Sequence, residues 1–327
     1  MSPDPPGPAA LIAGEALVDV VRAEGQAQRE HPGGSPANVA FGLARLGRPV
    51  HLSTWFGDDD RGALLRAHLT SAGVHLIEGS DRARRTSTAL AELDARGVAE
   101  YTFDLDWQLP PTVVADHVQV LHTGSIAATL PPGADDVAQL LHTGATRATI
   151  SYDPNLRPAI MGEPSAVRGR VQSLVAAADV VKVSDEDLGW LHPEKDPIAV
   201  ARSWVASGAG IVVVTCGGKP AVGVTANEMV IVPSTPAQVV DTVGAGDSYM
   251  AALLDALWQA DLLGAHRRGA LHQIGTTHLR AAMQQAGAAA AITVSRAGAD
   301  PPTRADLDRA LSHPPGTDTA SAPTEER

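Results

Sequence analysis

Short runs of β-branched and aliphatic residues alternate along the chain with longer stretches in which apolar residues recur every three or four positions. The runs predict buried strands, and the stretches predict helices with one apolar face. After a strand, a turn and a second strand within residues 10–21, the predicted strands are 49–57, 118–122, 148–152, 180–183 and 211–215. Strands that alternate with helices form parallel sheets, so the pattern predicts an α/β fold with a mostly parallel central sheet flanked by helices on both faces.

The helical segments carry recognisable start and stop signals. Ser35 is a plausible N-cap with Pro36 at the first helical position, and Gly47 suits the end of that helix. The segment DDDRGALLRAHLTSAG predicts a second helix, closed by Gly73. The alanine-rich final third predicts helices over 248–258 and, with breaks, over 266–291, while 221–224 and 229–232 form an antiparallel pair.

Residues 86–106 depart from this rhythm. Two extended arms flank Asp94-Ala95-Arg96-Gly97, and in the second arm Tyr101, Phe103 and Leu105 alternate with polar residues. Such alternation is typical of a β-hairpin with one apolar and one polar face. We expect a small β-sheet beside the main sheet, to which residues 17–33 add strands.

Composition and charge narrow the function. The chain has 327 residues, 44% of them hydrophobic, and its net charge of -12 argues against a nucleic-acid-binding protein. Only three lysines occur, which disfavours a basic patch for a membrane surface. The sole cysteine, Cys216, allows no internal disulfide, and the N-terminus resembles no signal peptide, so we expect a cytoplasmic protein.

The ends of the chain differ from the rest. Residues 1–10 are rich in proline, and residues 312–327 are small and polar. We expect both to be disordered tails. Residues 11–311 then form a single domain, with the small sheet drawn from about 17–33 and 86–106.

The sequence VVDTVGAGDSYM, from Val239, places two glycines and a carboxylate at the start of a predicted helix. It is neither a Walker A loop nor a dinucleotide fingerprint. The backbone N–H groups of Gly244, Ala245 and Gly246 could form an anion-binding nest, with Asp247 as a general base. The alternative is a tight turn with Asp247 as a helix cap.

Several motifs together resemble the ribokinase-like (PfkB) carbohydrate kinases. DTVGAGDSY is similar to the C-terminal signature of that family, GGSPANVAFGLARLG to its first signature, and WFGDDDRG supplies a G-x-D-x-x-G motif. GEALVD, SYDPNLRP and VKVSDEDLGWL resemble the fructokinase branch. The resemblance runs from about Leu11 to Thr303 in the right order. It implies a ribokinase-like fold, in which the small sheet from about 17–33 and 86–106 forms a lid, and an ATP-dependent sugar kinase.

The resemblance implies roles for individual residues. Asp247 would deprotonate the sugar hydroxyl, while the amides of Gly244, Ala245 and Gly246 hold the charge of the γ-phosphoryl group. The residues that would bind the sugar are Asp19, Gly33, Gly34, Asn38, Tyr101, Phe103, Asn155 and Arg157. The alternatives are a surface strand end for Asp19, and packing or a lid-to-lid homodimer contact for the two aromatic residues. Arg157, with Mg²⁺, is expected to balance the phosphates.

On the nucleotide side, the resemblance implies ATP contacts from Lys182, Ser184, Thr215, Gly217 and Gly246. Asp187 would organise Mg²⁺ indirectly, although Ser184 and Asp187 stand where many relatives carry Asn and Glu. Pro220 replaces a glycine that relatives place in the nucleotide loop. Asp241 and Thr242 would help to hold a monovalent cation such as K⁺, unless Asp241 only forms a turn.

The predicted acceptor is a neutral sugar. Kinases of this family that act on acidic keto-sugars often carry an arginine after the lid tyrosines, whereas this chain reads Tyr101-Thr102-Phe103-Asp104. D-fructose, giving fructose 6-phosphate, is the favoured substrate. Ribose, 2-keto-3-deoxygluconate, a nucleoside and a non-catalytic sugar-binding sensor remain alternatives.

Overall fold

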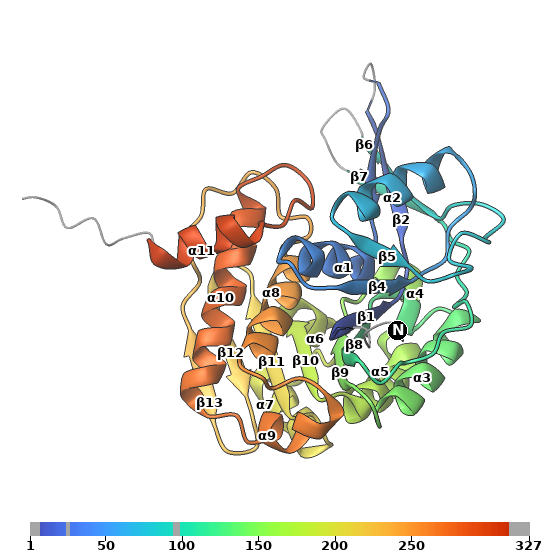
Figure 1. The fold of residues 1–327 in the computed structure, drawn as a ribbon. Coiled ribbons are helices and arrows are strands. Elements are labelled where there is room, and N and C mark those ends of the chain that lie inside the picture. The colour runs from blue at the N-terminus through green and yellow to red at the C-terminus, as the bar shows by residue number, and fades with distance from the viewer. Residues whose placement is uncertain (1–6, 24–26, 94–98, 314–327) are drawn as a thin grey trace, which may run out of the picture.

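The computed structural model describes residues 7–23, 27–93 and 99–313. Nine strands form the main sheet in the order β13-β12-β11-β10-β9-β8-β1-β4-β5 (Figure 1). All neighbours from β11 to β5 are parallel, and β12 and β13 are antiparallel, which confirms the mostly parallel sheet. The strands are β1 (Ala9–Ala13), β4 (Val50–Ser53), β5 (Val74–Leu76), β8 (Val118–Gly124), β9 (Thr149–Asp153), β10 (Val180–Ser184), β11 (Ile211–Cys216), β12 (Lys219–Val224) and β13 (Met229–Val232).

Helices cover both faces of this sheet. The α-helices are α1 (Ser35–Arg45), α2 (Asp60–Ser71), α3 (Gly133–Gly144), α4 (Pro158–Met161), α5 (Pro164–Ala177), α6 (Asp185–Leu191), α7 (Pro197–Ala206), α8 (Ala245–Gln259), α9 (Arg268–His272), α10 (Thr276–Val294) and α11 (Arg304–Ser312). Two short 3₁₀ turns, η1 (Ile126–Ala128) and η2 (Ala265–Arg267), complete the described elements.

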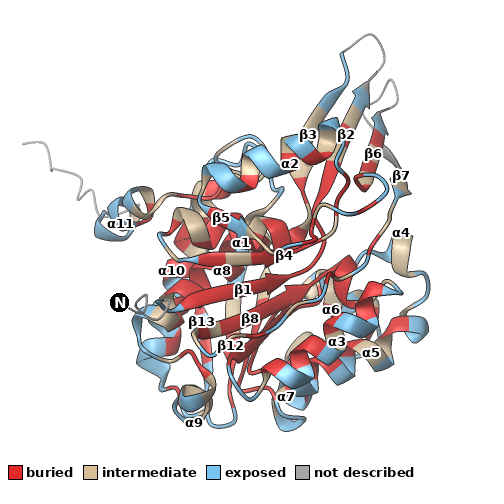
Figure 2. Ribbon diagram, turned by 45° about the vertical axis from the view of Figure 1, so that its right-hand side comes forward, coloured by how far each residue is buried: buried red, intermediate tan, exposed pale blue. Residues whose placement is uncertain are grey.

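Alternating side chains of the buried strands divide the core between the two faces. Ile12 of β1 packs in a cluster with residues of α1, α2, α8 and α10, whereas its neighbour Leu11 packs with α3, α5, α6 and α7. Val213 and Val212 of β11 divide in the same way. Successive side chains of a strand point to opposite faces, so a strand buried on both sides must be apolar throughout. This is why β1, AALIA, is completely buried (Figure 2).

The smaller sheet rises beside the main one as a separate lid (Figures 1 and 2). Its strands, in spatial order, are β3 (Arg29–Gly33), β2 (Leu17–Ala23), β6 (Thr88–Leu93) and β7 (Ala99–Asp104). β2 and β6 pair in parallel and join two antiparallel hairpins. The predicted hairpin and the contribution of residues 17–33 are therefore confirmed. The turn at 94–98 lies outside the described residues.

Some element boundaries differ from the expectation. The strand predicted over 49–57 ends at Ser53, because residues 54–57 leave the sheet and Gly57 bridges to Ala83. The helical stretch predicted over 266–291 is divided into η2, α9 and α10. β1 begins at Ala9, inside the expected N-terminal tail, and 1–6 and 314–327 lie outside the described residues. α11 extends to Ser312 and starts with a capping box between Thr303 and Asp306.

The strand order reverses direction at β1. The chain adds β4 and β5 on one side of β1, crosses through the lid, and returns to β8 on the other side. Loops that leave the carboxyl ends of β1 and β8 therefore diverge. In open α/β sheets, such a switch point is where ligands bind. Within the part of the chain that the structure describes, no helix is long and apolar enough to cross a membrane.

Candidate active site

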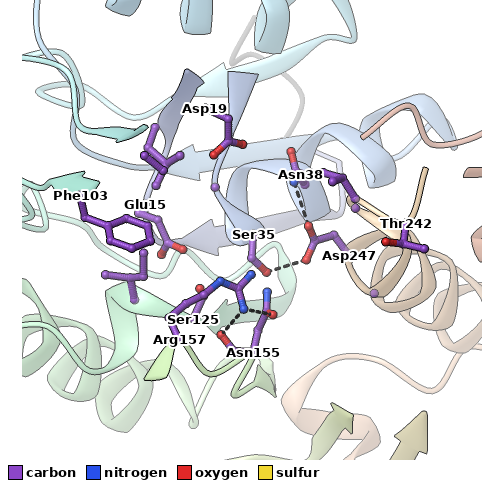
Figure 3. Close-up of a pocket in the computed structure, with 17 residues that line it drawn as sticks. Glu15, Asp19, Ser35, Asn38, Phe103, Ser125, Asn155, Arg157, Thr242 and Asp247 are labelled. Carbon is purple, nitrogen blue, oxygen red and sulfur yellow. Dashed lines mark hydrogen bonds between the residues drawn. The ribbon is translucent and has the colours of Figure 1, made fainter. Parts of the chain in front are cut away.

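A cavity of about 300 Å³ lies between the lid and the carboxyl edge of the main sheet (Figure 3). The lid supplies Asp19, Ala89 and Phe103, and the start of α8 supplies Gly244, Gly246 and Asp247. Of the predicted site residues, the cavity brings together Asp19, Gly34, Asn38, Phe103, Asn155, Arg157, Thr242, Gly244, Gly246 and Asp247. Motifs that are scattered over more than 200 residues of sequence thus meet at one place.

Asp247 is a buried carboxylate in the first turn of α8. The Ser35 hydroxyl donates to Oδ1 at 2.6 Å, and the Asn38 amide donates to Oδ2 at 2.8 Å. Both donors come from the start of α1 (Figure 3). Residues of the motif GGSPANVAFGLARLG therefore orient the carboxylate of the motif DTVGAGDSY. These two hydrogen bonds fix the orientation of the carboxylate beside the cavity.

Gly34 lets α1 begin close to the cavity. Its φ of 100° lies in a region that other residues avoid, and a Cβ on it would lie 2.5 Å from the Glu15 carbonyl oxygen. Gly33 is restricted by its neighbour: a Cβ there would lie 2.2 Å from Asp19 Oδ2. The paired glycines therefore allow the lid carboxylate and the start of α1 to approach each other.

The predicted anion nest has a buried ammonium group behind it. Lys182 Nζ forms an ion pair with Asp153 Oδ2 at 2.8 Å, and a Cβ on Gly246 would lie 2.8 Å from the same nitrogen. Burial opposes the charge of Lys182, but the attraction of Asp153, Asp247 and Asp187 outweighs it and raises the pKa of this lysine. The Ala245 N–H donates to the Thr242 carbonyl at 3.3 Å, so within the predicted nest this group already has a partner.

Asp19 extends from β2 of the lid into the cavity. Burial raises its pKa to about 6, with Asp247 adding to the shift and Arg157 and His31 opposing it. Of the two predicted lid aromatics, Phe103 lines the cavity and packs with Leu17, Ala89 and Ile126. Tyr101 lies in β7, but its side chain is outside what the structure describes.

Arg157 and Asn155 come from the loop that follows β9. Arg157 Nη1 donates to the Asn155 side chain at 2.7 Å and to the carbonyl oxygens of Asn155 and Leu156, each at 3.0 Å. Its guanidinium is thus braced by its own loop at the wall of the cavity, beside Asn155 and Ser125 (Figure 3). Arg157 lines the same cavity as Gly244, Gly246 and Asp247, and its role toward the phosphates stays a prediction.

The remaining predicted nucleotide and cation residues lie outside the cavity lining. Ser184 caps α6 by accepting from the Asp187 N–H, and Asp187 in turn accepts from the Leu156 N–H at 3.0 Å. Thr215 is the penultimate residue of β11, and Gly217 lies in the turn to β12. Asp241 accepts from the N–H groups of Val243 and Gly298, at 3.0 and 2.9 Å, and so braces two loops.

The cavity also contains residues that the sequence interpretation missed. They are Glu15, Leu17, Ser35, Ala89, Ser125, Ile126 and Val243. Glu15 stands inside the motif GEALVD, but the sequence interpretation gave it no role. Ser35 stands inside GGSPANVAFGLARLG and was predicted only to cap the helix. In the structure, Gly34 occupies the cap position of α1, and Ser35 is the first helical residue. Ser125 stands in no distinctive sequence pattern.

Comparisons with known proteins agree with this arrangement. The pfkB family of carbohydrate kinases matches residues 10–306. The chain is 32% identical to a fructokinase from Rhizobium leguminosarum bv. trifolii, over 77% of this chain and 81% of that protein. It is 31% identical to a fructokinase from Klebsiella pneumoniae, over 92% and 98%.

A solved structure shows the same fold. A double mutant of fructokinase from Vibrio cholerae O395, in the form with fructose, ADP and potassium ion bound, has a TM-score of 0.76 and 27% identity, over 92% of this chain and 97% of that one. The family match spans most of the chain and includes every element that builds the cavity. The chain therefore belongs to the pfkB family of carbohydrate kinases, as an ATP-dependent, fructokinase-like member.

Proposed function

We propose that the protein transfers the γ-phosphoryl group of ATP to a terminal hydroxyl of a neutral sugar, D-fructose, with Asp247 as the general base. The observation that carries the proposal is the buried Asp247 carboxylate, which Ser35 and Asn38 orient at the edge of a cavity shared with Gly244 and Gly246. The fructokinase relatives and the fructose bound to the Vibrio cholerae enzyme support the choice of sugar.

Asp247 accepts the proton of the attacking hydroxyl. Phosphoryl transfer passes through a loose transition state, so the base needs only to orient the hydroxyl and to take its proton late. Two hydrogen bonds fix the carboxylate in advance, which lowers the cost of reaching the reactive geometry. The position beside Gly246 then places the hydroxyl next to the group that it attacks.

Negative charge on the transferring group is balanced by the ammonium group of Lys182 and by the backbone N–H groups of Gly244 and Gly246, which line the cavity. Among the described residues, no three His, Cys, Asp or Glu side chains form a metal site. Proteins often bind Mg²⁺ through one or two carboxylates and the substrate phosphates. Asp187 is the residue that would hold it through water, and the ion would neutralise phosphate charge.

The lid side of the cavity binds the sugar. Asp19 accepts hydrogen bonds from sugar hydroxyls, and Phe103 closes the apolar side and excludes water from the phosphoryl group. Asp104, next to Phe103, accepts from Arg85 Nε at 2.8 Å on the outer lid. This pairing neutralises the arginine near the lid aromatics, which supports a neutral acceptor over a sugar acid.

The test is ADP release by purified protein with a panel of fructose, ribose, 2-keto-3-deoxygluconate and nucleosides. Fructose should give the highest kcat/KM. Asp247→Asn keeps the shape of the side chain but removes its basicity, and we expect kcat to fall roughly 100- to 10,000-fold. Asp136→Asn, an exposed acidic residue on α3, is the matched control and should keep full activity.

Equal rates for the wild type and Asp247→Asn with every acceptor would refute the kinase mechanism and favour a sugar-binding sensor. Full activity on another acceptor and none on fructose would correct the substrate alone. The homodimer through the lid, the cytoplasmic location, the potassium site near Asp241 and Thr242, and the nucleotide contacts of Ser184, Thr215 and Gly217 stay predictions.

A further inference from the structure

Glu15 is a buried carboxylic acid at the switch point of the main sheet. It follows β1 after a single glycine, its side chain lines the cavity, and only 5% of its surface is exposed. Figure 3 shows its carboxyl group directed into the space between Phe103 and Ser35. A charged residue type is rarely buried to this extent unless a partner compensates for the lost water.

One oxygen of this carboxyl group has a structural role. Oε2 accepts the Ala127 N–H at 2.9 Å and so holds the η1 turn against the loop after β1. This single bond also fixes the direction of the whole side chain. A role limited to bracing η1 would need only that oxygen.

The second oxygen is left without a partner. Oε1 is buried and accepts no hydrogen bond from any described residue. Ser125 lies close enough to lower the pKa of Glu15, but its hydroxyl does not reach hydrogen-bonding geometry. Arg157 also acts on Glu15 through its charge, while its Nη1 donates to Asn155 and Leu156. An unsatisfied buried acceptor is costly, so a group that binds in the cavity and donates to it gains affinity.

We propose that Glu15 is a further sugar-recognition residue, whose Oε1 accepts a hydrogen bond from one hydroxyl of the bound acceptor. This inference rests on the proposed sugar kinase function and deepens it. The cavity then grips the sugar with two carboxylates, Asp19 from the lid and Glu15 from the main sheet. Two fixed acceptors select a polyhydroxyl compound and repel a sugar acid.

Burial supports this assignment, since it raises the pKa of Glu15 to about 7, although the N–H groups of Glu15 and Ala127 and the nearby Ser125 hydroxyl act to lower it. A donor hydroxyl at Oε1 would stabilise the ionised form and recover part of the lost solvation. The carboxyl group is therefore prepared for a ligand that brings a hydrogen-bond donor and little charge.

The test combines a protein change with a change in the sugar. Glu15→Gln can still accept from Ala127 but presents an uncharged amide at the position of Oε1. Binding of D-fructose and of a series of fructose analogues, each lacking one hydroxyl, would be measured by calorimetry without nucleotide. Glu228→Gln, on the exposed turn between β12 and β13, is the matched control.

We expect Glu15→Gln to raise the Kd for fructose roughly tenfold, the value for loss of one charge-assisted hydrogen bond, and KM to rise without an equal fall in kcat. For one analogue, the wild type and Glu15→Gln should bind with equal affinity, because that analogue lacks the hydroxyl that Glu15 holds. Glu228→Gln should match the wild type throughout.

If Glu15→Gln raised the Kd by the same factor for fructose and for every analogue, Glu15 would have a structural role only. That result would overturn the inference. In that case a wild type that still binds and phosphorylates fructose would leave the proposed function intact. A wild type that binds fructose by calorimetry but releases no ADP would overturn the proposed kinase reaction, while the analogue series still decides the role of Glu15. Failure of the wild type to bind any sugar would overturn both.

Discussion

At the scale of single residues, the arrangement around Gly246 resolves a conflict of charge. The loop that we propose to receive the phosphoryl group also carries the Asp247 carboxylate, and Arg157 is expected to help balance this negative charge. The structure adds a second cation, because the ammonium group of Lys182 lies behind Gly246 and is paired with Asp153. A cation that is already buried and fixed needs no rearrangement when negative charge develops in front of it.

The same scale gives a prediction about pH and stability. The pKa of Glu15 is about 7 in the folded protein and near the model-peptide value of 4.5 after unfolding. Between these values the folded state holds more protons than the unfolded state, so stability falls as pH rises through this window. The protonated carboxyl group contributes on the order of 3 kcal/mol to the free energy of unfolding. This contribution is fully present below about pH 4.5 and is lost above about pH 7.

Urea unfolding of the wild type and Glu15→Gln between pH 5 and pH 8 checks this prediction. The glutamine does not titrate, so the unfolding free energy of Glu15→Gln relative to the wild type should increase with pH. Glu228→Gln should show no such trend because that side chain is exposed in both states. A constant difference between Glu15→Gln and the wild type over this pH range would contradict the raised pKa.

At the scale of elements, the G-x-D-x-x-G motif acts as an anchor for the lid. Asp59 caps α2 through the Gly62 N–H, and the same carboxylate accepts from the Thr86 N–H at 2.8 Å and the Thr86 hydroxyl at 2.6 Å. Thr86 stands two residues before β6, so one side chain ties the base of the lid to the main domain. Arg61 of α2 adds an ion pair with Glu30 of β3 at 2.7 Å.

Asp59→Ala should therefore affect both stability and substrate binding. Loss of the cap costs about 1 kcal/mol, and loss of the two bonds to Thr86 adds about 1 kcal/mol or more. Because the base of the lid loosens, KM for the sugar should rise several-fold. Urea unfolding and steady-state kinetics give the two values.

Asp196→Ala is the matched control, because Asp196 caps α7 through the Ala199 N–H and has no role in the lid. It should lose only the capping energy and keep the wild-type KM. If both variants showed the same loss of stability and an unchanged KM, Asp59 would be an ordinary helix cap.

The elements also show what sequence can and cannot predict. Strands buried on both faces, such as β1 and β11, are visible as continuous apolar runs, and the lid is visible as alternation in 101–105. The resemblance of the ordered motifs to one family then predicted that Asp19, Asn38 and Asp247 belong to one site. Glu15 was missed because its importance comes from burial and from an unpaired oxygen, which no local pattern encodes. Ser125 was missed because its strained backbone, with φ of 55°, is set by the surrounding fold.

At the scale of the whole molecule, α8 is held at both ends by residues that are distant in sequence. Near its C-terminal end, Asp255 is fully buried and forms ion pairs with Arg48 at 2.7 Å and Arg304 at 2.6 Å. Gln285 of α10 donates to the same carboxylate at 2.7 Å. One side chain thereby joins the loop after α1 with α8, α10 and α11, and it lies two turns beyond Asp247 on the same helix.

Asp255→Ala should destabilise the protein strongly, on the order of 3 kcal/mol, because it leaves two arginines and a buried amide without their shared acceptor. The measurement is the shift of the urea midpoint. Asp308→Ala removes the exposed contact of the same Arg304, 3.8 Å away, and should change stability by less than about 1 kcal/mol. Equal effects of the two substitutions would show that the buried brace contributes little.

The pairing of Ser35 with Asp247 joins positions 212 residues apart. A ribosome that synthesises the chain from its N-terminus must therefore pass Asp247 before Ser35 can find its partner, and α10 must follow before α8 is covered. The cavity thus cannot be completed during synthesis of the segments that precede α8. For the same reason, a break in the exposed turn between β12 and β13 would divide the protein into two inactive fragments, so that catalysis would report their reassociation.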